Sequence, residues 1–256
     1  MISALDVTRL EKAAHDNGFD LLQSTSGDWL CIASSHCPLK IWLSTAENGV
    51  ILIGFADRSV ARSLLNLGIP LDHNQPSGAS DLLSVPDLTS LYALLKRAFQ
   101  LSRALPSAPL NEFRQQIQTL PNATEAERVV IQRVGQNIFR ERLIEYWDGG
   151  CAVTGLRVPA LLRASHIKPW RDCASDAERL DVFNGLLLAP NLDLAFDQGF
   201  ISFEDVGTIC LSRLLDETAV DRLGFSPIMR ISGLALDHVP FLKWHREHIF
   251  QRQEGT

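Results

Sequence analysis

The chain has 256 residues, of which 46% are hydrophobic and 21% charged, a composition typical of a soluble globular protein. It contains no uninterrupted run of about 18 apolar residues, which argues against a membrane span, and its first residues lack the basic and apolar regions of a secretory signal. Five cysteines without a Cys-x-x-Cys pair indicate free thiols in a reducing compartment. We therefore expect a cytoplasmic protein that carries no structural zinc.

The first part of the chain, residues 1–105, has the pattern of an α+β domain. A small antiparallel sheet is predicted where β-branched and aromatic residues gather, at 29–33, 39–43 and 50–55. Helices are predicted at 5–14, 59–67 and 87–104, the last with Asp87 as its cap. Between the last two helices, several prolines and Gly78 predict a long irregular connection.

A polar stretch at 106–123, rich in Pro and Gln, is the best candidate for a linker to a second domain at 124–256. The second domain should open with a long helix at 124–146, ended by Gly149-Gly150. Its later part predicts a hairpin of strands at 200–203 and 208–212 and a last helix at 239–251. The inner side of the long helix is expected to hold Val129, Val130, Val134, Ile138, Leu143 and Ile144.

The region 165–199 combines polar residues in a spacing that suggests chemistry. It predicts a strand ending at His166, a polar loop, a short apolar strand at 186–188, and a helix after Pro190 that Asn191 can cap. Asp193 and Asp197 are four residues apart, so both carboxylates project from one face of that helix. A histidine beside two carboxylates suits hydrolysis assisted by one metal ion.

The order His166, Asn184, Asp193, with Asp197 one turn later, resembles the HNH endonucleases and their ββα-metal fold. The resemblance covers roughly the C-terminal half of the chain, and the first hundred or so residues resemble no family we recognise. Three further segments are similar to one bacterial, restriction-endonuclease-like HNH subgroup: Cys151-Ala152-Val153-Thr154-Gly155, Phe196-Asp197-Gln198-Gly199 and Trp244-His245-Arg246-Glu247.

The resemblance implies a role for each polar residue of the motif. His166 would be the general base, and Asn184 would complete the catalytic site by tying the loop so that His166 points inward. Asp193 and Asp197 would bind the metal, and oxygen ligands favour Mg²⁺ or Mn²⁺; alternatively, Asp197 caps the following turn and Asp193 binds alone. Two positions depart from the family pattern: Asp193 often corresponds to histidine, and Ser165 to a further ligand.

The net charge of −6 hides an uneven distribution. Between residues 128 and 171, eight Arg or Lys stand against three acids, a local charge of +5, whereas 172–225 holds three bases against eleven acids, a local charge of −8. A basic segment before an acidic, metal-capable one suits a phosphodiester substrate, which the resemblance implies is double-stranded DNA. The cations expected to bind DNA phosphates are Arg163, Lys168, Arg171 and Arg179, each of which could instead be simply solvated.

The sequence thus predicts a metal-dependent HNH endonuclease that hydrolyses DNA, as a restriction enzyme whose N-terminal domain recognises its target. That target could be modified DNA, with Trp29 and Trp42 stacking on bases or, alternatively, filling the sheet core. Cleavage of both strands would suit a homodimer. Two other readings stay open: a defence nuclease gated by a ligand or partner, and an inactive DNA-binding protein on an HNH scaffold. His245 and His248 are expected to serve helix charge matching or packing.

Overall fold

The computed structural model describes residues 2–46, 48–72, 75–105, 107–118 and 124–251. The chain forms two compact units, Met1–Ala108 and Pro109–Thr256. Both units mix helices with antiparallel strands, so the predicted α+β class is confirmed. None of the helices in the described ranges is long and apolar enough to cross a membrane.

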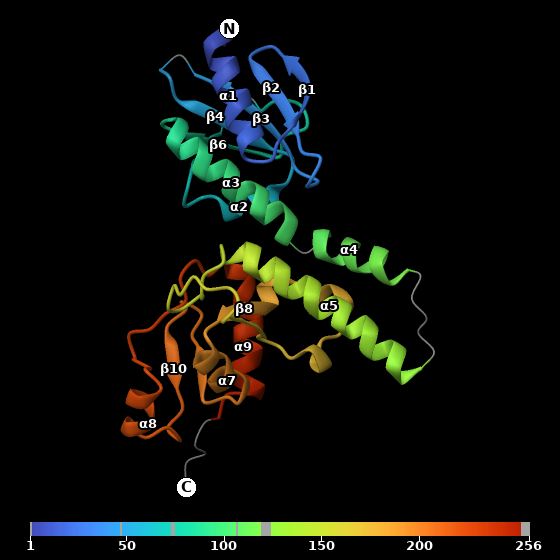
Figure 1. Ribbon diagram of the computed structural model, residues 1–256. Coiled ribbons are helices and arrows are strands. Elements are labelled where there is room, and N and C mark those ends of the chain that lie inside the picture. Colours follow the sequence, from blue (N-terminus) through green and yellow to red (C-terminus); the bar gives the residue numbers. More distant parts are fainter. Residues whose placement is uncertain (1, 47, 73–74, 106, 119–123, 252–256) are drawn as a thin grey trace. The chain divides into compact units, whose positions relative to one another are not determined.

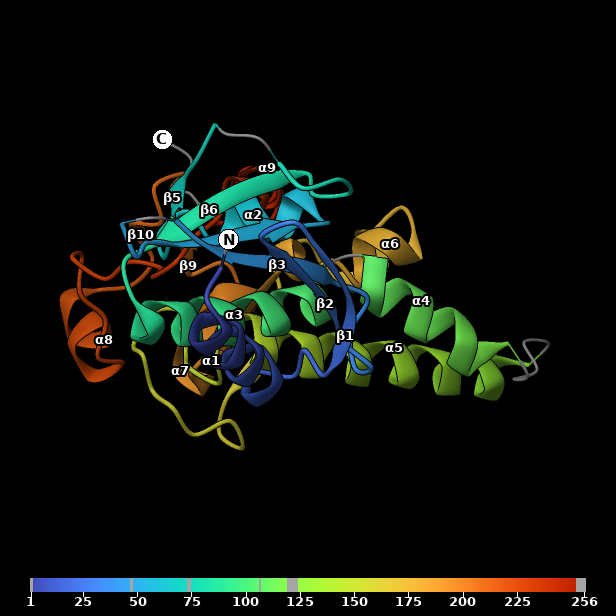
Figure 2. The same cartoon turned by 90° about the horizontal axis from the view of Figure 1, so that it is seen from above.

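The first unit is built on a six-stranded antiparallel sheet with strand order β1-β2-β3-β4-β6-β5. Helices α1 (Ala4–Asp16) and α3 (Leu88–Ala104) contact each other, and Figure 2 shows them on one face of this sheet. Helix α2 (Arg58–Ser63) packs against α3 and strands β4 and β6. The strands are β1 (Leu21–Ser26), β2 (Trp29–Ala33), β3 (Lys40–Thr45), β4 (Ile51–Phe55), β5 (Ile69–Pro70) and β6 (Asp81–Val85).

Alternation along the central strands separates the two faces of the sheet. Leu43 pairs with both Leu30 and Ile53 across the sheet, and all three side chains are buried, as period-two strands require. Trp42 points to the opposite face, where it is 8% exposed and lies against the position of Gly78. Trp42 is therefore part of the packed interior, whereas Trp29 is partly exposed.

Two segments of the first unit differ from the sequence-based expectation. Strand β1 was not predicted, because Leu21 and Leu22 are exposed and the strand carries polar residues. Strands β5 and β6 lie within the stretch predicted as an irregular connection. That prediction was wrong because the apolar run of β6 is short and is flanked by turn residues, although β6 pairs with β4 over five residues.

The predicted linker is also different, since helix α4 (Ser107–Ile117) occupies most of it. Pro109 and Phe113 are buried, and Glu112 forms a 2.7 Å ion pair with Arg142 of helix α5 (Glu125–Tyr146). Because of these contacts, the segment packs against α5 as a helix, whereas its composition alone suggested a flexible hinge. Residues 106 and 119–123 of the predicted linker lie outside the described residues.

Helix α5 begins with a capping box between Thr124 and Glu127, which satisfies free N–H groups at its start. Its second half is buried through Ile138 and Leu143, as predicted. The expectation for its first half was wrong, because Val129 and Val130 are 42% and 48% exposed. Apolar side chains recur along the whole helix, but those of its second half are the ones that are buried.

The second unit places a two-stranded sheet of β7 (Arg163–His166) and β8 (Gly185–Leu188) between α5 and α7 (Pro190–Asp197). Figure 1 shows α5, α7 and α9 around this sheet. Its apolar core is centred on Leu186, Leu187, Leu188 and Phe196. The remaining elements are α6 (Asp176–Arg179), the predicted hairpin of β9 (Ile201–Phe203) and β10 (Ile209–Leu211), α8 (Glu217–Arg222) and α9 (Val239–His248).

Candidate active site

Strands β7 and β8 set the position of His166 at the end of the small sheet. Their register pairs His166 with Gly185, and Ile167 donates to the carbonyl of Asn184 at 3.0 Å. A Cβ atom at position 185 would lie 2.5 Å from Cζ of Phe139, so glycine permits helix α5 to pack directly against the end of the sheet.

The loop between His166 and β8 is held by the buried side chain of Asn184. Its Oδ1 accepts the backbone N–H of Lys168 at 2.7 Å, and its Nδ2 donates to the carbonyls of Lys168 at 3.1 Å and Glu178 at 3.2 Å. Nδ2 also lies 3.3 Å from the sulfur of Cys173. Asn184 is 0% exposed and satisfies buried backbone groups at both ends of the loop.

Two of the predicted phosphate-binding cations belong to this loop. Lys168 forms a 2.7 Å ion pair with Glu178, and both side chains are largely buried. Arg179 forms a 2.8 Å ion pair with Asp176 and donates to the carbonyls of Trp170 and Cys173. Both cations are therefore bonded within the protein, and Arg179 closes the loop through hydrogen bonds to three separate acceptors.

His166 is oriented by a hydrogen bond of 2.9 Å between its Nε2 and the carbonyl oxygen of Arg179. Because a carbonyl only accepts, Nε2 carries the proton in the neutral ring and Nδ1 holds a lone pair. Burial lowers the pKa of His166 to about 4, against the opposing effect of that hydrogen bond. The imidazole is therefore neutral at pH 7, the form in which it can accept a proton.

Helix α7 presents the two predicted metal ligands on the side of the sheet where Ser165 emerges. The predicted cap at Asn191 is wrong, because Ala189 is the cap residue and Pro190 opens the helix; Asn191 instead donates to the carbonyl of Leu223 at 2.8 Å. The hydroxyl of Ser165 donates to Oδ1 of Asp197 at 3.3 Å.

Both carboxylates of α7 ionise less readily than free aspartate. Burial raises the pKa of Asp193, against the effects of Ser165 and the charge of Arg163. Burial, followed by the negative charge of Asp193, raises the pKa of Asp197 to about 6. A close pair of like charges without a neutralising cation is unfavourable, so the pair suits a bound positive ion.

The donor atoms in this site fit a hard divalent cation. Among the described residues, no group of three or more His, Cys, Asp or Glu side chains could hold a metal ion, so the site depends on two carboxylates. Mg²⁺ is commonly bound through one or two carboxylates together with water and substrate phosphate oxygens. Asp193 and Asp197, with the Ser165 hydroxyl beside them, match that kind of incomplete oxygen shell.

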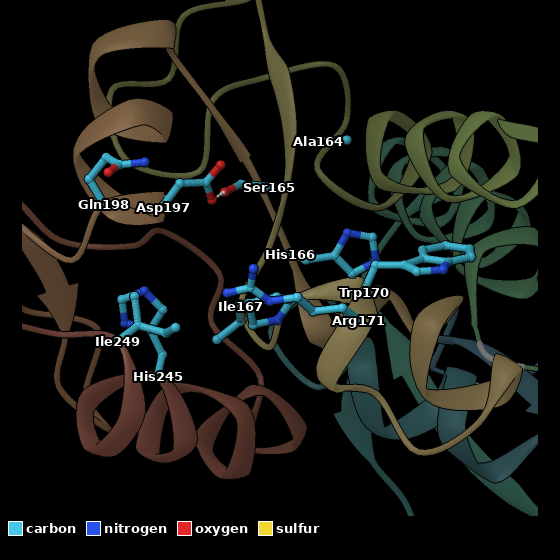
Figure 3. Close-up of a pocket in the computed structure, with 11 residues that line it drawn as sticks. Ala164, Ser165, His166, Ile167, Trp170, Arg171, Asp197, Gln198, His245 and Ile249 are labelled. Carbon is cyan, nitrogen blue, oxygen red and sulfur yellow. Dashed lines mark hydrogen bonds between the residues drawn. The ribbon is translucent and has the colours of Figure 1, made fainter. Parts of the chain in front are cut away.

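A cleft of about 380 Å³ brings part of the predicted site together. Of the predicted residues, His166, Arg171 and Asp197 line it, whereas Asn184 is buried behind it. Figure 3 shows Ser165 bonded to Asp197 on one side, His166 and Trp170 on the other, and His245 reaching in from α9. Arg171 is exposed, with a long 3.5 Å ion pair to Asp172, and Arg163 on β7 is exposed as well.

Several residues around the site were not assigned there from the sequence. His245 is buried, donates from Nε2 to the carbonyl of Phe196 at 3.1 Å, and pairs through Nδ1 with Ser202 at 2.9 Å. It packs α9 against α7 beside Asp197, in agreement with the packing alternative. Phe139 and Trp170 contact the His166 ring. Two glycines are sequence signals that could have indicated these close approaches: Gly135, inside the long helix, and Gly185, at the start of the second strand.

Comparison with known proteins identifies the part of the chain that carries this site. Residues 151–204 match the model of a family described as HNH endonuclease, and no curated protein matches the chain. The matched residues contain His166, Asn184, Asp193 and Asp197. The second unit thus contains an HNH endonuclease domain, which implies phosphodiester hydrolase activity on DNA and the general use of a divalent metal ion.

Proposed function

We propose that the protein is a DNA endonuclease in which His166 activates water and Asp193 and Asp197 hold a divalent ion, Mg²⁺ or Mn²⁺. The observation that supports this most strongly is the state of His166. Its ring is neutral and carries its proton on Nε2, and Nδ1 has no hydrogen-bond partner among the residues that the structure describes. The ring and Asp197 line the same cleft, so a base and a carboxylate face one substrate.

The proposed reaction moves a proton from water to Nδ1 of His166 as the water oxygen bonds to phosphorus. The bond from phosphorus to the 3′ oxygen breaks, and the leaving oxygen takes a proton from solvent water, which gives 5′-phosphate and 3′-hydroxyl ends. When Nδ1 takes the proton, the ring becomes an imidazolium whose Nε2–H still donates to the carbonyl of Arg179. That bond favours the charged ring, so the same contact that sets the tautomer also stabilises the product of proton transfer.

The divalent ion would supply charge stabilisation for the phosphate oxygens and the leaving oxygen. Ser165 would keep the Asp197 carboxylate oriented toward the ion through its hydrogen bond. Arg163 and Arg171, which are exposed beside the site, would bind backbone phosphates, whereas Lys168 and Arg179 would act through the loop that they close. Backbone contacts of this kind carry little sequence information.

Specificity would then come from the first unit, and we propose that it recognises the DNA target and that the whole chain acts as a restriction enzyme. Trp29 remains partly exposed on its sheet and is the candidate for stacking on a base. A homodimer would allow both strands to be cut.

A plasmid cleavage assay tests this proposal. Wild-type protein and His166→Ala would be incubated with unmodified and enzymatically modified plasmid DNA, in Mg²⁺, Mn²⁺ or EDTA. We expect cleavage that requires both the metal and His166, and a difference between the two DNAs would support target reading by the first unit. DNA binding without cleavage under every metal would overturn the proposal in favour of an inactive or gated protein.

A further inference from the structure

The imidazole of His166 is enclosed by two aromatic rings that differ in geometry. Phe139 of helix α5 stacks on it, with ring centroids 3.8 Å apart and an angle of 15° between the planes. Trp170 meets it edge-on, at 5.6 Å and 86°. One ring therefore covers a face of the imidazole, while the other closes its side.

Two glycines provide the space for this arrangement. A Cβ atom at Gly185 would lie 2.5 Å from Cζ of Phe139, and one at Gly135 would lie 2.5 Å from Cη2 of Trp170. The same Cβ atom at Gly135 would lie 3.3 Å from the ring of Phe113, on helix α4. The Trp170 ring is covered in addition by the guanidinium of Arg179, at 5.7 Å. Each ring is thus fixed by contacts of its own.

We propose that Phe139 is a positioning residue of the active site, which holds the plane of the His166 imidazole so that Nδ1 stays directed at the cleft. This rests on the proposed role of His166 as general base. Phe139 lies on α5, outside residues 151–204 that match the HNH model. The functional nuclease therefore includes a helix that the motif region does not contain.

The geometry explains why a ring is needed at this position. The hydrogen bond from Nε2 to Arg179 fixes one atom of the imidazole, but a single bond leaves the ring free to tilt about it. A stacked ring removes that freedom and excludes water from one face of the imidazole, and an aromatic partner does so through its preferred geometry. The charged or titratable groups that line the same cleft as His166 are Arg171, Asp197 and His245, and Arg179 contacts both His166 and Trp170.

The test compares Phe139→Leu with Phe225→Leu in the full-length protein. Both phenylalanines are buried in the second unit, but Phe225, which follows α8 in the chain, is not among the described residues whose rings contact His166. Nitrogen NMR would report the tautomer and the pKa of His166, and cleavage kinetics would separate kcat from KM. For Phe139→Leu we expect the pKa of His166 to rise from about 4 toward 6.5, mixed tautomers, and kcat lower by about 10- to 100-fold with KM little changed.

Phe225→Leu should leave the His166 spectrum as in the wild type. A folded Phe139→Leu variant with the wild-type tautomer and pKa would overturn the proposal. If that variant does not fold, Phe139→Met, which keeps most of the buried volume without a ring, gives the same test. The NMR result does not depend on cleavage, so a failure of the nuclease assignment would be seen separately, as a wild-type protein with an ordered His166 and no cleavage.

Discussion

Nε2 of His166 donates to the backbone carbonyl of Arg179 at 2.9 Å, a contact between the end of one strand and a short helix 13 residues later. The carbonyl is itself fixed, because the side chain of Arg179 is bonded to Asp176 and to the carbonyls of Trp170 and Cys173. The tautomer and orientation of the candidate base therefore depend on how the intervening loop is folded. Experiments can distinguish residues that hold this loop from residues that bind DNA.

Salt dependence distinguishes the two kinds of arginine. Arg171→Ala should weaken DNA binding and reduce the slope of log affinity against log salt by about 0.9, the change expected for one lost phosphate contact. Arg179→Ala should lower kcat while leaving that slope nearly unchanged, because its guanidinium is bonded within the protein. Fluorescence anisotropy at several salt concentrations measures the slope for each variant, and cleavage kinetics measure kcat. Equal slope changes for the two variants would contradict the distinction between a DNA-binding and a loop-closing arginine.

Asn184→Ala should destabilise the second unit strongly. The substitution leaves buried backbone groups of Lys168 and Glu178 without partners, and each such group costs about 1–3 kcal/mol. We expect the free energy of unfolding to fall by about 2–4 kcal/mol, measured by urea denaturation. Asn191→Ala, which removes one exposed hydrogen bond, is the matched control and should cost less than about 1 kcal/mol. Similar losses for both would argue against the loop-tying role of Asn184.

Neutralising one carboxylate of α7 should have opposite effects with and without metal. In EDTA, Asp197→Asn relieves repulsion with Asp193, worth roughly 0.2–0.5 kcal/mol for a helical pair of like charges, so Tm should rise slightly. With saturating Mg²⁺ or Mn²⁺, the wild type should gain Tm through binding and the variant should gain much less. Asp221→Asn, an exposed acid on α8, serves as control. An equal metal-induced gain in all three proteins would place the metal elsewhere.

His238 should make stability depend on pH. It is completely buried among the rings of Tyr146, Trp147 and Phe183, and burial lowers its pKa to about 4, from 6.5. The unfolded chain therefore takes up a proton that the folded chain does not, so this stabilisation is present above pH 6.5 and is lost as the pH falls through 4. The size of the loss is about 3 kcal/mol.

The variant His238→Phe isolates that contribution, since it keeps an aromatic ring in the same aromatic surroundings. Urea denaturation at about pH 6.5 and about pH 4.5 should show a smaller fall in unfolding free energy for the variant than for the wild type. If both proteins lose the same amount, His238 does not titrate as its burial implies.

The sequence predicted elements well where a local signal was strong. Asp87 caps α3 as expected, the strand ending at His166 and the helix through Asp197 are present, and the hairpin after Gly199 forms. Local sequence signals did not predict the elements that depend on tertiary contacts. Helix α4 depends on the burial of Phe113 and on the ion pair of Glu112, which a polar composition does not reveal.

The candidate site shows the same division. Spacing placed the two aspartates on one helix, but it could not show that Phe139, 27 positions before His166, would stack on the imidazole. Nor could it show that Lys168 and Arg179 would be taken up by ion pairs inside the loop. Contacts between residues far apart in the chain depend on packing, which one sequence does not encode in any local pattern.

The measurement that tests the central claim most directly is chemical rescue of His166→Gly. The rate of cleavage of a duplex would be measured for this variant in saturating metal, with and without added imidazole. We predict that the substitution lowers the cleavage rate by about 10²- to 10⁴-fold and that added imidazole partly restores it. The restored rate should fall at acidic pH according to the pKa of the added base. Cleavage by His166→Gly at the wild-type rate, without imidazole, would contradict the role of His166 as the general base.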